Sequence, residues 1–437
     1  MSERVPVAVL GGGLTGLSAS LHLGRAGISH RLFEREQVAG GHAVTVEEQG
    51  FRFDRTGHLL HLRDPAMQAL AYELLPAEQY RKLQRQSAVF SHGVYTRYPF
   101  QANTFGLPPE VAFECVHGFV QAHFARTEQA SEPRNFEEFC LRHFGSGISR
   151  HFMLPYNSRL WGVPPSEITS EWCQRFVPLP RLEDVLRGAV GANARELGYN
   201  TTFLYPELGM GSFSAALAAR TPVELGRAPA RIDLGRRTLV FADDELPFDV
   251  LVSSIPLPSL LRLLGDLPAA VTEAASKLRA THLHYLDLGL RRANPNPYHW
   301  IYVPEAHFPF YRVGCYSHFS DRLAPPGKSS LYVELAERRT PNPERTLAEV
   351  TAGLRTLGLL KSEQDIELWR LRTIDYAYVI YDHNYRAALD VIEPYLTEQR
   401  IVSRGRYGAW NYSSMEDALL MGRDAAGRAV RLLGHGV

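Results

Sequence analysis

Residues 5 to 17 read Val-Pro-Val-Ala-Val-Leu-Gly-Gly-Gly-Leu-Thr-Gly-Leu, and this stretch decides the fold. Its apolar first half predicts a buried strand, and the residues from Leu17 onward predict a helix. Between them Gly11, Gly13 and Gly16 match the pattern G-x-G-x-x-G. Such glycines permit a tight turn, close approach of a pyrophosphate to the backbone, and close packing of the helix on the strand. The helix N-terminus then offers unpaired N–H groups to the phosphates.

The next strand strengthens this interpretation. Arg31-Leu32-Phe33 predicts a second strand, and it ends in Glu34, 18 residues after Gly16. A carboxylate at that distance can accept hydrogen bonds from both ribose hydroxyls of a dinucleotide. Because strand, glycine turn, helix, second strand and acid all occur in order, the signal is stronger than the glycines alone.

Later glycine turns favour FAD over NAD as the dinucleotide. Gly40-Gly41-His42 would let the flavin approach the backbone, and Gly57-His58 follows a short strand. Residues 248–256 look like the late strand of flavoproteins with two dinucleotide folds, and residues 405–422 would close a helix N-terminus over the flavin. The predicted FAD contacts are Gly11, Gly13, Leu14, Thr15, Gly16, Glu34, Arg35, Gly40, Gly41, His42, Gly57, His58, Arg406, Met415 and Glu416.

Composition excludes several classes of protein. The 437 residues contain 47 Lys plus Arg and 47 Asp plus Glu, so no basic surplus exists to neutralise nucleic acid. No stretch reaches the roughly 18 apolar residues of a membrane helix, and residues 1–6 do not resemble a signal peptide. The four cysteines form no close pair. His58 and His61 lack a third ligand at a suitable spacing, so no metal is expected. We therefore expect a cytoplasmic protein that binds neither nucleic acid nor membranes.

The remaining sequence changes character along the chain. Residues 105–200 have mostly helical periodicity, whereas Leu286, Leu288 and Leu290 alternate with Asp287 and Gly289. That period of two predicts an antiparallel sheet with one covered face. The expected fold class is α/β: a Rossmann-like FAD-binding domain (1–90, 205–265 and 396–437), a helical insertion (91–204) and an antiparallel β-sheet substrate domain (266–395).

Four further motifs are distinctive enough to compare with known families. They are Tyr98-Pro99-Phe100-Gln101, Phe152-Met153-Leu154-Pro155-Tyr156-Asn157-Ser158-Arg159-Leu160-Trp161-Gly162, Pro309-Phe310-Tyr311-Arg312 and Ser403-Arg404-Gly405-Arg406-Tyr407-Gly408-Ala409-Trp410. In this order and approximate spacing they resemble the UDP-galactopyranose mutases, closest to the eukaryotic type, within the amine-oxidase-like flavoproteins. The resemblance runs from residue 5 to residue 430, which is nearly the whole chain.

The resemblance implies a UDP-sugar substrate and roles for particular residues. Arg175, Arg312 and His58 would be catalytic, with the two arginines on the diphosphate and His58 beside the flavin. The implied substrate contacts are Tyr98, Phe100, Gln101, Phe152 and Met153 at the uridine, and Asn157, Trp161, Arg175, Asn200, Tyr302, Arg312, Tyr378 and Tyr412 at the diphosphate and sugar. Residue chemistry agrees, because diphosphates suit arginine forks and a uracil suits an aromatic face with an amide.

The implied reaction interconverts the pyranose and furanose rings of a UDP-sugar such as UDP-galactose, a step of polysaccharide biosynthesis. N5 of reduced FAD would attack the anomeric carbon as UDP leaves, and the adduct would open and reclose before UDP returns. NAD(P)H is a candidate external reductant. The sequence leaves open the sugar, the physiological reductant and whether the chain forms a homo-oligomer.

Three departures from the mutase pattern keep alternatives open. Phe319 stands where the family has a tyrosine, which predicts one lost hydrogen bond to phosphate and tighter UDP binding after Phe319→Tyr. Ala377-Tyr378-Val379 replaces Gly-Tyr-Pro, and residues 415–419 resemble the ending of flavin amine oxidases. One alternative is an FAD-dependent oxidoreductase of the amine oxidase/protoporphyrinogen oxidase-like class. The other is a flavin-stabilised structural protein without enzymatic activity.

Overall fold

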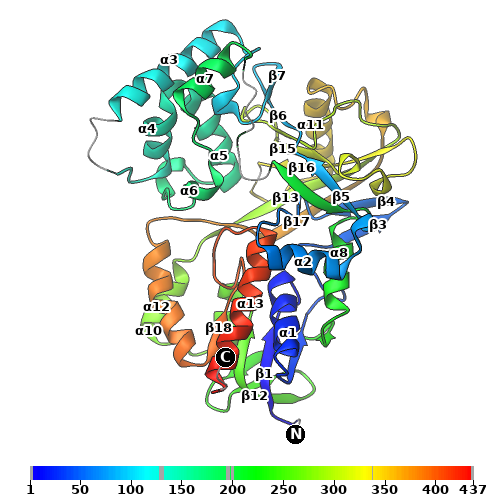
Figure 1. Cartoon of the computed structure of the whole chain (residues 1–437), viewed down its shortest axis with the longest axis vertical. Coiled ribbons are helices and arrows are strands. Elements are labelled where there is room, and N and C mark those ends of the chain that lie inside the picture. The colour runs from blue at the N-terminus through cyan, green and yellow to red at the C-terminus, as the bar shows by residue number, and fades with distance from the viewer. Residues whose placement is uncertain (1–2, 127–131, 193–196, 198–200, 337, 435–437) are drawn as a thin grey trace.

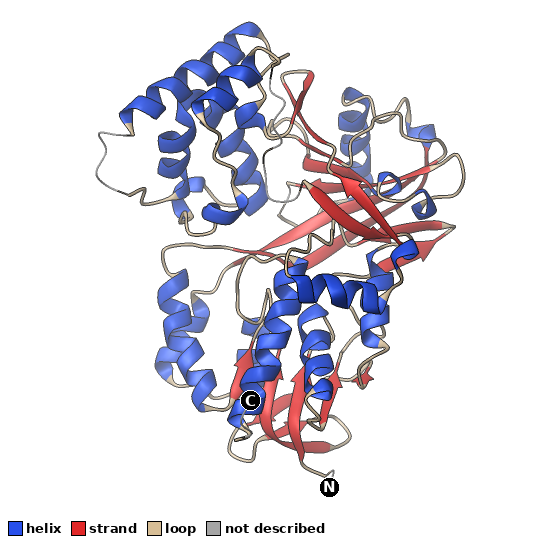
Figure 2. Cartoon of the chain, in the orientation of Figure 1, coloured by secondary structure: helices blue, strands red, loops and turns tan. Residues whose placement is uncertain are grey.

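Two seven-stranded sheets organise the chain, one below and one above the middle of Figure 1. The computed structural model describes residues 3–126, 132–192, 197, 201–336 and 338–434. The N-terminus and the end of the last helix both lie at the lower sheet, while a group of helices stands beside the upper sheet (Figure 2).

The lower sheet has the parallel centre that the glycine motif predicts. Strand β1 (Val5–Leu10) lies between β12 (Glu245–Ser253) and β2 (His30–Phe33) and runs parallel to both. Residues 7–9 are fully buried, as expected for a strand covered on both faces. Its other strands are β9 (Val223–Glu224), β10 (Arg231–Asp233), β11 (Thr238–Val240) and β18 (Ile401–Ser403). Helices α1 (Leu14–Arg25) and α13 (Met415–Leu432) pack on each other against this sheet (Figure 1).

The upper sheet is antiparallel except for the parallel pair β14–β6. In spatial order its strands are β17 (Ile366–Val379), β13 (Ala280–Leu290), β16 (Ser329–Leu335), β15 (Phe310–Cys315), β14 (Trp300–Tyr302), β6 (Ser87–Ser91) and β7 (Val94–Arg97). Leu286 and Leu288 pack in one apolar cluster with Val350 and Leu354 of helix α11 (Pro343–Thr356).

The expectation of one covered face was wrong for this sheet, because both faces are buried. Every residue of β16 is buried, and Asp287 on β13 is only 1% exposed. The second face is covered by the N-terminal strands: a Cβ on Gly289 would lie 2.9 Å from the Phe51 ring. Asp287 is paired there with Arg372, whose Nε donates to its carboxylate at 2.7 Å. Polar residues alternate in these strands because their face meets a cavity and other strands.

The helical segment stands at the upper left of Figure 1 and supplies one wall of the site. Helices α3 and α4 approach closely, since a Cβ on Gly147 would lie 2.1 Å from the carbonyl oxygen of Glu114. Asn135 caps α4 by accepting a hydrogen bond from the backbone N–H of Glu138 at 2.9 Å. The helices are α3 (Pro109–Ala125), α4 (Phe136–Ile148), α5 (Leu154–Trp161), α6 (Cys173–Phe176) and α7 (Leu182–Ala189), with a π-helical turn at Ser149–Met153.

The remaining elements differ from the expected domain limits in two places, and those limits stay a prediction. Strand β6, which includes residue 90, belongs to the upper sheet rather than to the nucleotide sheet. Helices α10 and α12 fall inside the expected sheet domain, yet they pack on each other, and α12 packs against β18. The other elements are β3 (Thr45–Glu48), β4 (Phe51–Asp54), α2 (Pro65–Leu74), β5 (Tyr80–Gln84), β8 (Thr202–Pro206), α8 (Met210–Ala218), α9 (Leu257–Leu264), α10 (Ala269–Ser276) and α12 (Tyr385–Glu398).

Candidate active site

A cavity of about 1940 Å³ lies where the two sheets meet. The carboxyl ends of β1, β2 and β12 form its lower side, and the polar face of β13 to β17 forms its upper side. Ligands of open α/β sheets bind at this end of the strands. Because a site for one small ligand measures about 300–1,000 Å³, this cavity has room for a dinucleotide and a second molecule.

The first glycine turn has the geometry of a phosphate site. Gly11 has a φ of +97°, and a Cβ there would lie 2.6 Å from Oγ of Ser254. At Gly13 the Cβ position is open, with the nearest atom 3.8 Å away, so a pyrophosphate can approach the backbone. Gly16 does not line the cavity: its Cβ would lie 1.8 Å from the carbonyl oxygen of Gly11. Its role is the close packing of helix on strand.

Glu34 is buried at the end of β2 and faces the same turn. Its Oε2 accepts a hydrogen bond from the N–H of Gly12 at 2.7 Å, and its Oε1 accepts one from the N–H of Glu36 at 2.9 Å. Each carboxylate oxygen has a second lone pair, so both can still accept ribose hydroxyls. Leu14, Thr15 and Arg35 also line the cavity here.

Residues 227–230 close this end of the cavity, and the sequence analysis missed them. The backbone N–H of Arg227 donates to the carbonyl oxygen of Glu34 at 2.8 Å, and its guanidinium lies 4.5 Å from the Phe241 ring centroid. No local pattern marks this segment. It reaches the site because β9 pairs with β2 across a separation of almost 200 residues in the sequence.

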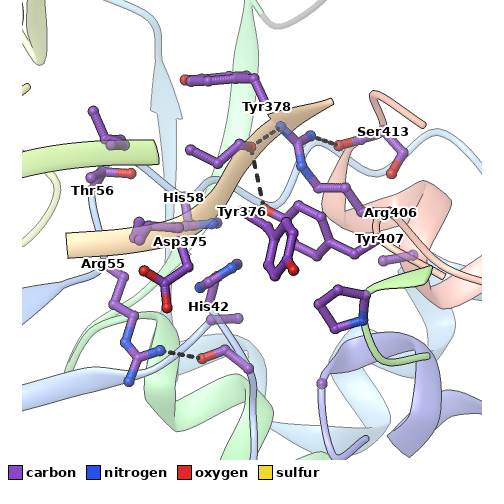
Figure 3. Close-up of a pocket in the computed structure, with 18 of the residues that line it drawn as sticks. His42, Arg55, Thr56, His58, Asp375, Tyr376, Tyr378, Arg406, Tyr407 and Ser413 are labelled. Atoms are coloured by element: carbon purple, nitrogen blue, oxygen red, sulfur yellow. Dashed lines mark hydrogen bonds between the residues drawn. The ribbon is translucent and has the colours of Figure 1, made fainter. Parts of the chain in front are cut away.

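Two neutral histidines face the region beyond the glycines (Figure 3). Burial lowers the pKa of His42 to about 3 and that of His58 to about 4, with Arg406 acting in the same direction. Nδ1 of each ring is buried without a hydrogen-bond partner among the described residues. Gly40, Gly41 and Gly57 line the cavity beside them. Two neutral imidazoles beside glycine backbone that lines the cavity fit a planar heterocycle such as a flavin.

Arg406 joins the C-terminal segment to β17. Its guanidinium donates to the carbonyl oxygens of Ser413 at 2.6 Å and Ala377 at 3.1 Å, and the Tyr407 hydroxyl donates to the same Ala377 oxygen (Figure 3). The guanidinium also lies 4.7 Å from the ring centroid of Tyr412. It lines the cavity, with part of its donor capacity already used by the main chain.

Of the two predicted contacts at the start of α13, only Met415 lines the cavity. Glu416 is 4% exposed and does not line the cavity, so its contact with the cofactor stays a prediction that the geometry does not favour. Its Oε1 accepts hydrogen bonds from the N–H groups of Arg63 and Asp64. The carboxylate therefore holds the chain entering α2.

The predicted uridine residues form a lobe of the cavity beside the helical segment. Tyr98, Gln101, Phe152 and Met153 line it. Gln101 donates from Nε2 to the carbonyl oxygen of Pro178 at 2.9 Å, and its Oε1 is buried without a partner among the described residues. Phe100 does not line the cavity, contrary to expectation: it is fully buried behind Phe152, with ring centroids 5.0 Å apart.

Arg312 is the charged centre of the neighbouring region, which Asn157, Tyr302, Tyr378 and Tyr412 also line. Its Nη2 donates to both oxygens of Glu334 at 2.6 and 2.7 Å and to the Tyr378 hydroxyl at 3.0 Å. Glu334 is fully buried, and Nε of Arg312 has no partner among the described residues. The guanidinium is thus held rigidly through Nη2.

Trp161 and Phe319 do not line the cavity. Trp161 is fully buried against Tyr378 and Tyr412, which themselves line the cavity. Phe319 is fully buried, stacked on His299 at 5.3 Å and beside Tyr205 at 4.9 Å. A hydroxyl at position 319 would therefore lie outside the cavity, which corrects the expectation that Phe319→Tyr tightens UDP.

The structure does not test two of the predicted residues. Asn200 lies outside the described residues, and the described structure of Arg175 is limited to its backbone in α6. Among the parts of the chain that are described, no group of three His, Cys, Asp or Glu side chains is placed to hold a metal. No helix in those parts is long and apolar enough to span a bilayer.

Several lining residues were missed although their strands were predicted. Tyr156 follows the predicted uridine residues on α5, and Tyr285, Tyr332, Arg372 and Tyr376 come from β13, β16 and β17. Tyr332 occupies a position between the apolar residues Leu331 and Val333, and this alternation signalled it. Tyr285, Arg372 and Tyr376 each have a polar neighbour in the sequence, so no apolar alternation marks them.

One cavity thus has room for a dinucleotide at the glycine turns and for a second ligand around Arg312. This arrangement is that of a flavoprotein with a separate substrate region. Sequence comparison then supplies the family. Residues 14–430 match the profile of the flavin containing amine oxidoreductases, and the chain belongs to that family. Its cofactor is FAD.

Two solved structures share the fold over nearly the whole chain. Reduced UDP-galactopyranose mutase matches with a TM-score of 0.92 and 27% identity, covering 99% of this chain and 95% of that protein. Wild-type putrescine oxidase bound to putrescine matches with a TM-score of 0.65 and 15% identity, covering 98% and 99%. The second likeness, at such low identity, shows the fold alone.

Curated relatives align over shorter segments. Phytoene dehydrogenase of Streptomyces griseus is 28% identical over 285 residues, which are 60% of this chain and 56% of that protein. Pyridine nucleotide-disulfide oxidoreductase domain-containing protein 2 of Mus musculus is 47% identical over 66 residues, 15% of this chain and 11% of that protein. The chain thus matches about half the length of the first relative and a small part of the second.

Proposed function

We propose that this flavoprotein is a nucleotide-sugar mutase that interconverts the ring forms of a UDP-sugar such as UDP-galactose. The observation that carries the proposal is the likeness to reduced UDP-galactopyranose mutase, at 27% identity over 99% of this chain. Among the similar structures and relatives described above, that protein combines the highest structural similarity with full coverage. The site residues quoted below support the same assignment.

The uridine would bind in the lobe lined by Tyr98, Gln101, Phe152 and Met153. Gln101 also lines this lobe, but its unpaired Oε1 is buried, so it would accept a hydrogen bond from N3–H of a uracil after a change of side-chain rotamer. The aromatic rings supply a flat apolar surface on which a pyrimidine can pack. A base with an acceptor at that position would leave the Gln101 oxygen unpaired and bind less well.

The diphosphate would lie at Arg312 and the tyrosine hydroxyls. The pair with buried Glu334 holds the guanidinium in one orientation, so little reorganisation is needed when a phosphate arrives. The part of the Arg312 guanidinium that is exposed in the cavity and the Tyr378 hydroxyl, which accepts from Nη2 and keeps its own proton to donate, are the donors to the phosphates. They would stabilise the charge that develops on the leaving nucleotide.

FAD fits the other part of the cavity, where Glu34, the two glycine turns and the unpaired histidine nitrogens lie. When bound and reduced, it would supply the nucleophilic nitrogen that the ring interconversion needs. His42 and His58 stay neutral above pH 5 because their pKa values are about 3 and 4. They can therefore hydrogen-bond a heterocycle without adding positive charge.

The direct test is anaerobic incubation of dithionite-reduced protein with UDP-galactose. Chromatography is expected to resolve a second UDP-sugar of unchanged mass, with no reductant consumed per turnover. The oxidised protein is expected to give none. If an amine or alcohol instead reduces the flavin stoichiometrically, and no UDP-hexose or UDP-pentose isomerises, the protein is an oxidoreductase. The similarity to phytoene dehydrogenase favours this second candidate function.

Phe319→Tyr is expected to leave UDP binding unchanged. The ring packs against His299 and Tyr205 outside the cavity, so the new hydroxyl would be buried away from the diphosphate. A buried hydroxyl without a partner costs about 1–3 kcal/mol, which should lower the melting temperature of the variant. The additional rise in melting temperature on adding UDP should match that of the wild type. A clearly larger rise in the variant would show that residue 319 reaches the nucleotide.

A further inference from the structure

Tyr332 reaches the upper side of the cavity through space left by two glycines. It lies on β16, directly opposite Gly314 on β15. A Cβ on Gly314 would lie 2.0 Å from Cε1 of the Tyr332 ring, and a Cβ on Gly57 would lie 2.3 Å from its hydroxyl oxygen. Packed protein interiors do not accommodate such contacts. The position of this ring therefore depends on glycine at both sites.

The Tyr332 hydroxyl is not used by the protein itself. The residue is 1% exposed and lines the cavity, and its hydroxyl makes no hydrogen bond to any described residue. Neighbouring Tyr316, whose ring centroid lies 4.9 Å away, behaves differently, because its hydroxyl donates to the carbonyl oxygen of Asp54. A buried phenol normally has a polar partner. The free hydroxyl of Tyr332 is therefore available to a ligand.

The surroundings of this hydroxyl place it at the sugar rather than at the base. It touches Gly57, which precedes His58 on the flavin side of the cavity. Glu334, two residues further along β16 and on the same face, holds Arg312. Burial raises the pKa of Tyr332 more than the nearby Arg312 lowers it, so the phenol keeps its proton. It can then both donate and accept.

We propose that Tyr332 is a specificity residue whose hydroxyl hydrogen-bonds a hydroxyl group of the sugar between His58 and Arg312. This inference rests on the proposed function. The mutase pattern has a tyrosine at position 319, where this chain has a phenylalanine that lies outside the cavity. Tyr332 instead supplies a phenol inside the cavity. A site built to hydrogen-bond one substrate hydroxyl discriminates against the analogue that lacks it.

The test is the variant Tyr332→Phe, which keeps the ring that fills the space at Gly314. The reduced variant is expected to retain its flavin and its affinity for UDP, while kcat/KM for UDP-galactose falls by roughly 10- to 100-fold. Wild type and variant are then compared on the three UDP-deoxygalactoses lacking the hydroxyl at C2, C3 or C6, because the C4 hydroxyl closes the furanose ring and its loss blocks the reaction itself. The wild type should penalise the analogue that lacks the partner hydroxyl, and the variant should lose that penalty for the same analogue alone.

Tyr311→Phe is the matched control. Tyr311 lies on β15, and its hydroxyl is buried without a partner among the described residues, but it does not line the cavity. Its loss should change neither kcat/KM nor the pattern over the deoxy sugars.

The outcomes separate this inference from the function on which it rests. A wild-type protein that turns over no UDP-sugar overturns both. If the wild type is active and the Tyr332→Phe variant has the same kcat/KM and the same deoxy-sugar pattern, only the role of Tyr332 is overturned. A variant that loses affinity for UDP as much as for UDP-galactose places the hydroxyl at the nucleotide and also overturns the inference.

Discussion

An Arg312→Ala variant is expected to keep its FAD and to lose turnover of UDP-galactose by about 10³-fold or more. The guanidinium lies in the cavity region proposed for the diphosphate. Its loss removes the positive charge available to the leaving nucleotide and one hydrogen bond to Tyr378. Arg312→Lys keeps the charge but not the planar fork, so it should recover only part of the activity.

The same substitution has a structural cost that must be separated from the catalytic one. Arg312→Ala leaves the fully buried carboxylate of Glu334 without its partner. Breaking a buried pair in this way costs about 3–5 kcal/mol of folding stability. The double variant Arg312→Ala/Glu334→Gln removes both charges, so its melting temperature should recover much of the loss while turnover stays absent.

Three measurements decide this prediction: flavin content by absorbance, melting temperature, and isomerisation rate of the reduced protein. The three variants are compared with the wild type under the same conditions. If the double variant regains turnover together with stability, Arg312 acts only through the fold. If Arg312→Ala loses its flavin, the arginine belongs to the cofactor side of the cavity.

The cofactor half could be predicted from the sequence because its signals are local. Gly11 and Gly16 each have a steric reason to lack a side chain, Gly13 leaves the backbone open to a pyrophosphate, and Glu34 follows the next strand and bonds the same turn. These constraints involve backbone atoms within one βαβ unit. Resemblance was not needed to identify them.

The substrate half was harder because side-chain direction is set by packing. Phe100 and Trp161 belong to the right segments but turn behind Phe152 and the tyrosines. Glu416 starts the predicted helix yet binds the backbone of another segment. Phe319 follows β15 after a turn, so its spacing from Arg312 does not fix the face on which it lies.

Tyr332 shows why some cavity residues could not be predicted from the sequence. Its place in the alternating run of β16 was visible, but the pattern alone cannot distinguish a face that meets solvent from one that meets a cavity. Only the position of Gly57, more than 270 residues earlier in the chain, makes the hydroxyl part of the site. Long-range pairing of this kind is absent from local sequence patterns.

Glu34→Ala is expected to yield protein that is largely free of flavin. In the FAD complex, the carboxylate would accept both ribose hydroxyls, and each charge-assisted bond contributes about 1.5–3 kcal/mol. Losing both corresponds to roughly a 10²- to 10⁴-fold weaker affinity. In the wild type the carboxylate accepts hydrogen bonds from the N–H groups of Gly12 and Glu36. The substitution removes both bonds and so loosens the glycine turn.

Glu34→Gln serves as the matched control because it keeps the size and one acceptor oxygen. It should retain more flavin than Glu34→Ala, and both should regain it when titrated with excess FAD, followed by quenching of flavin fluorescence. Arg35→Ala provides a second comparison at the adjacent exposed position, where the guanidinium is 76% exposed and pairs only weakly with Glu36. If Arg35→Ala loses flavin while Glu34→Ala keeps it, the ribose is held by the arginine and the role argued for the buried carboxylate is wrong.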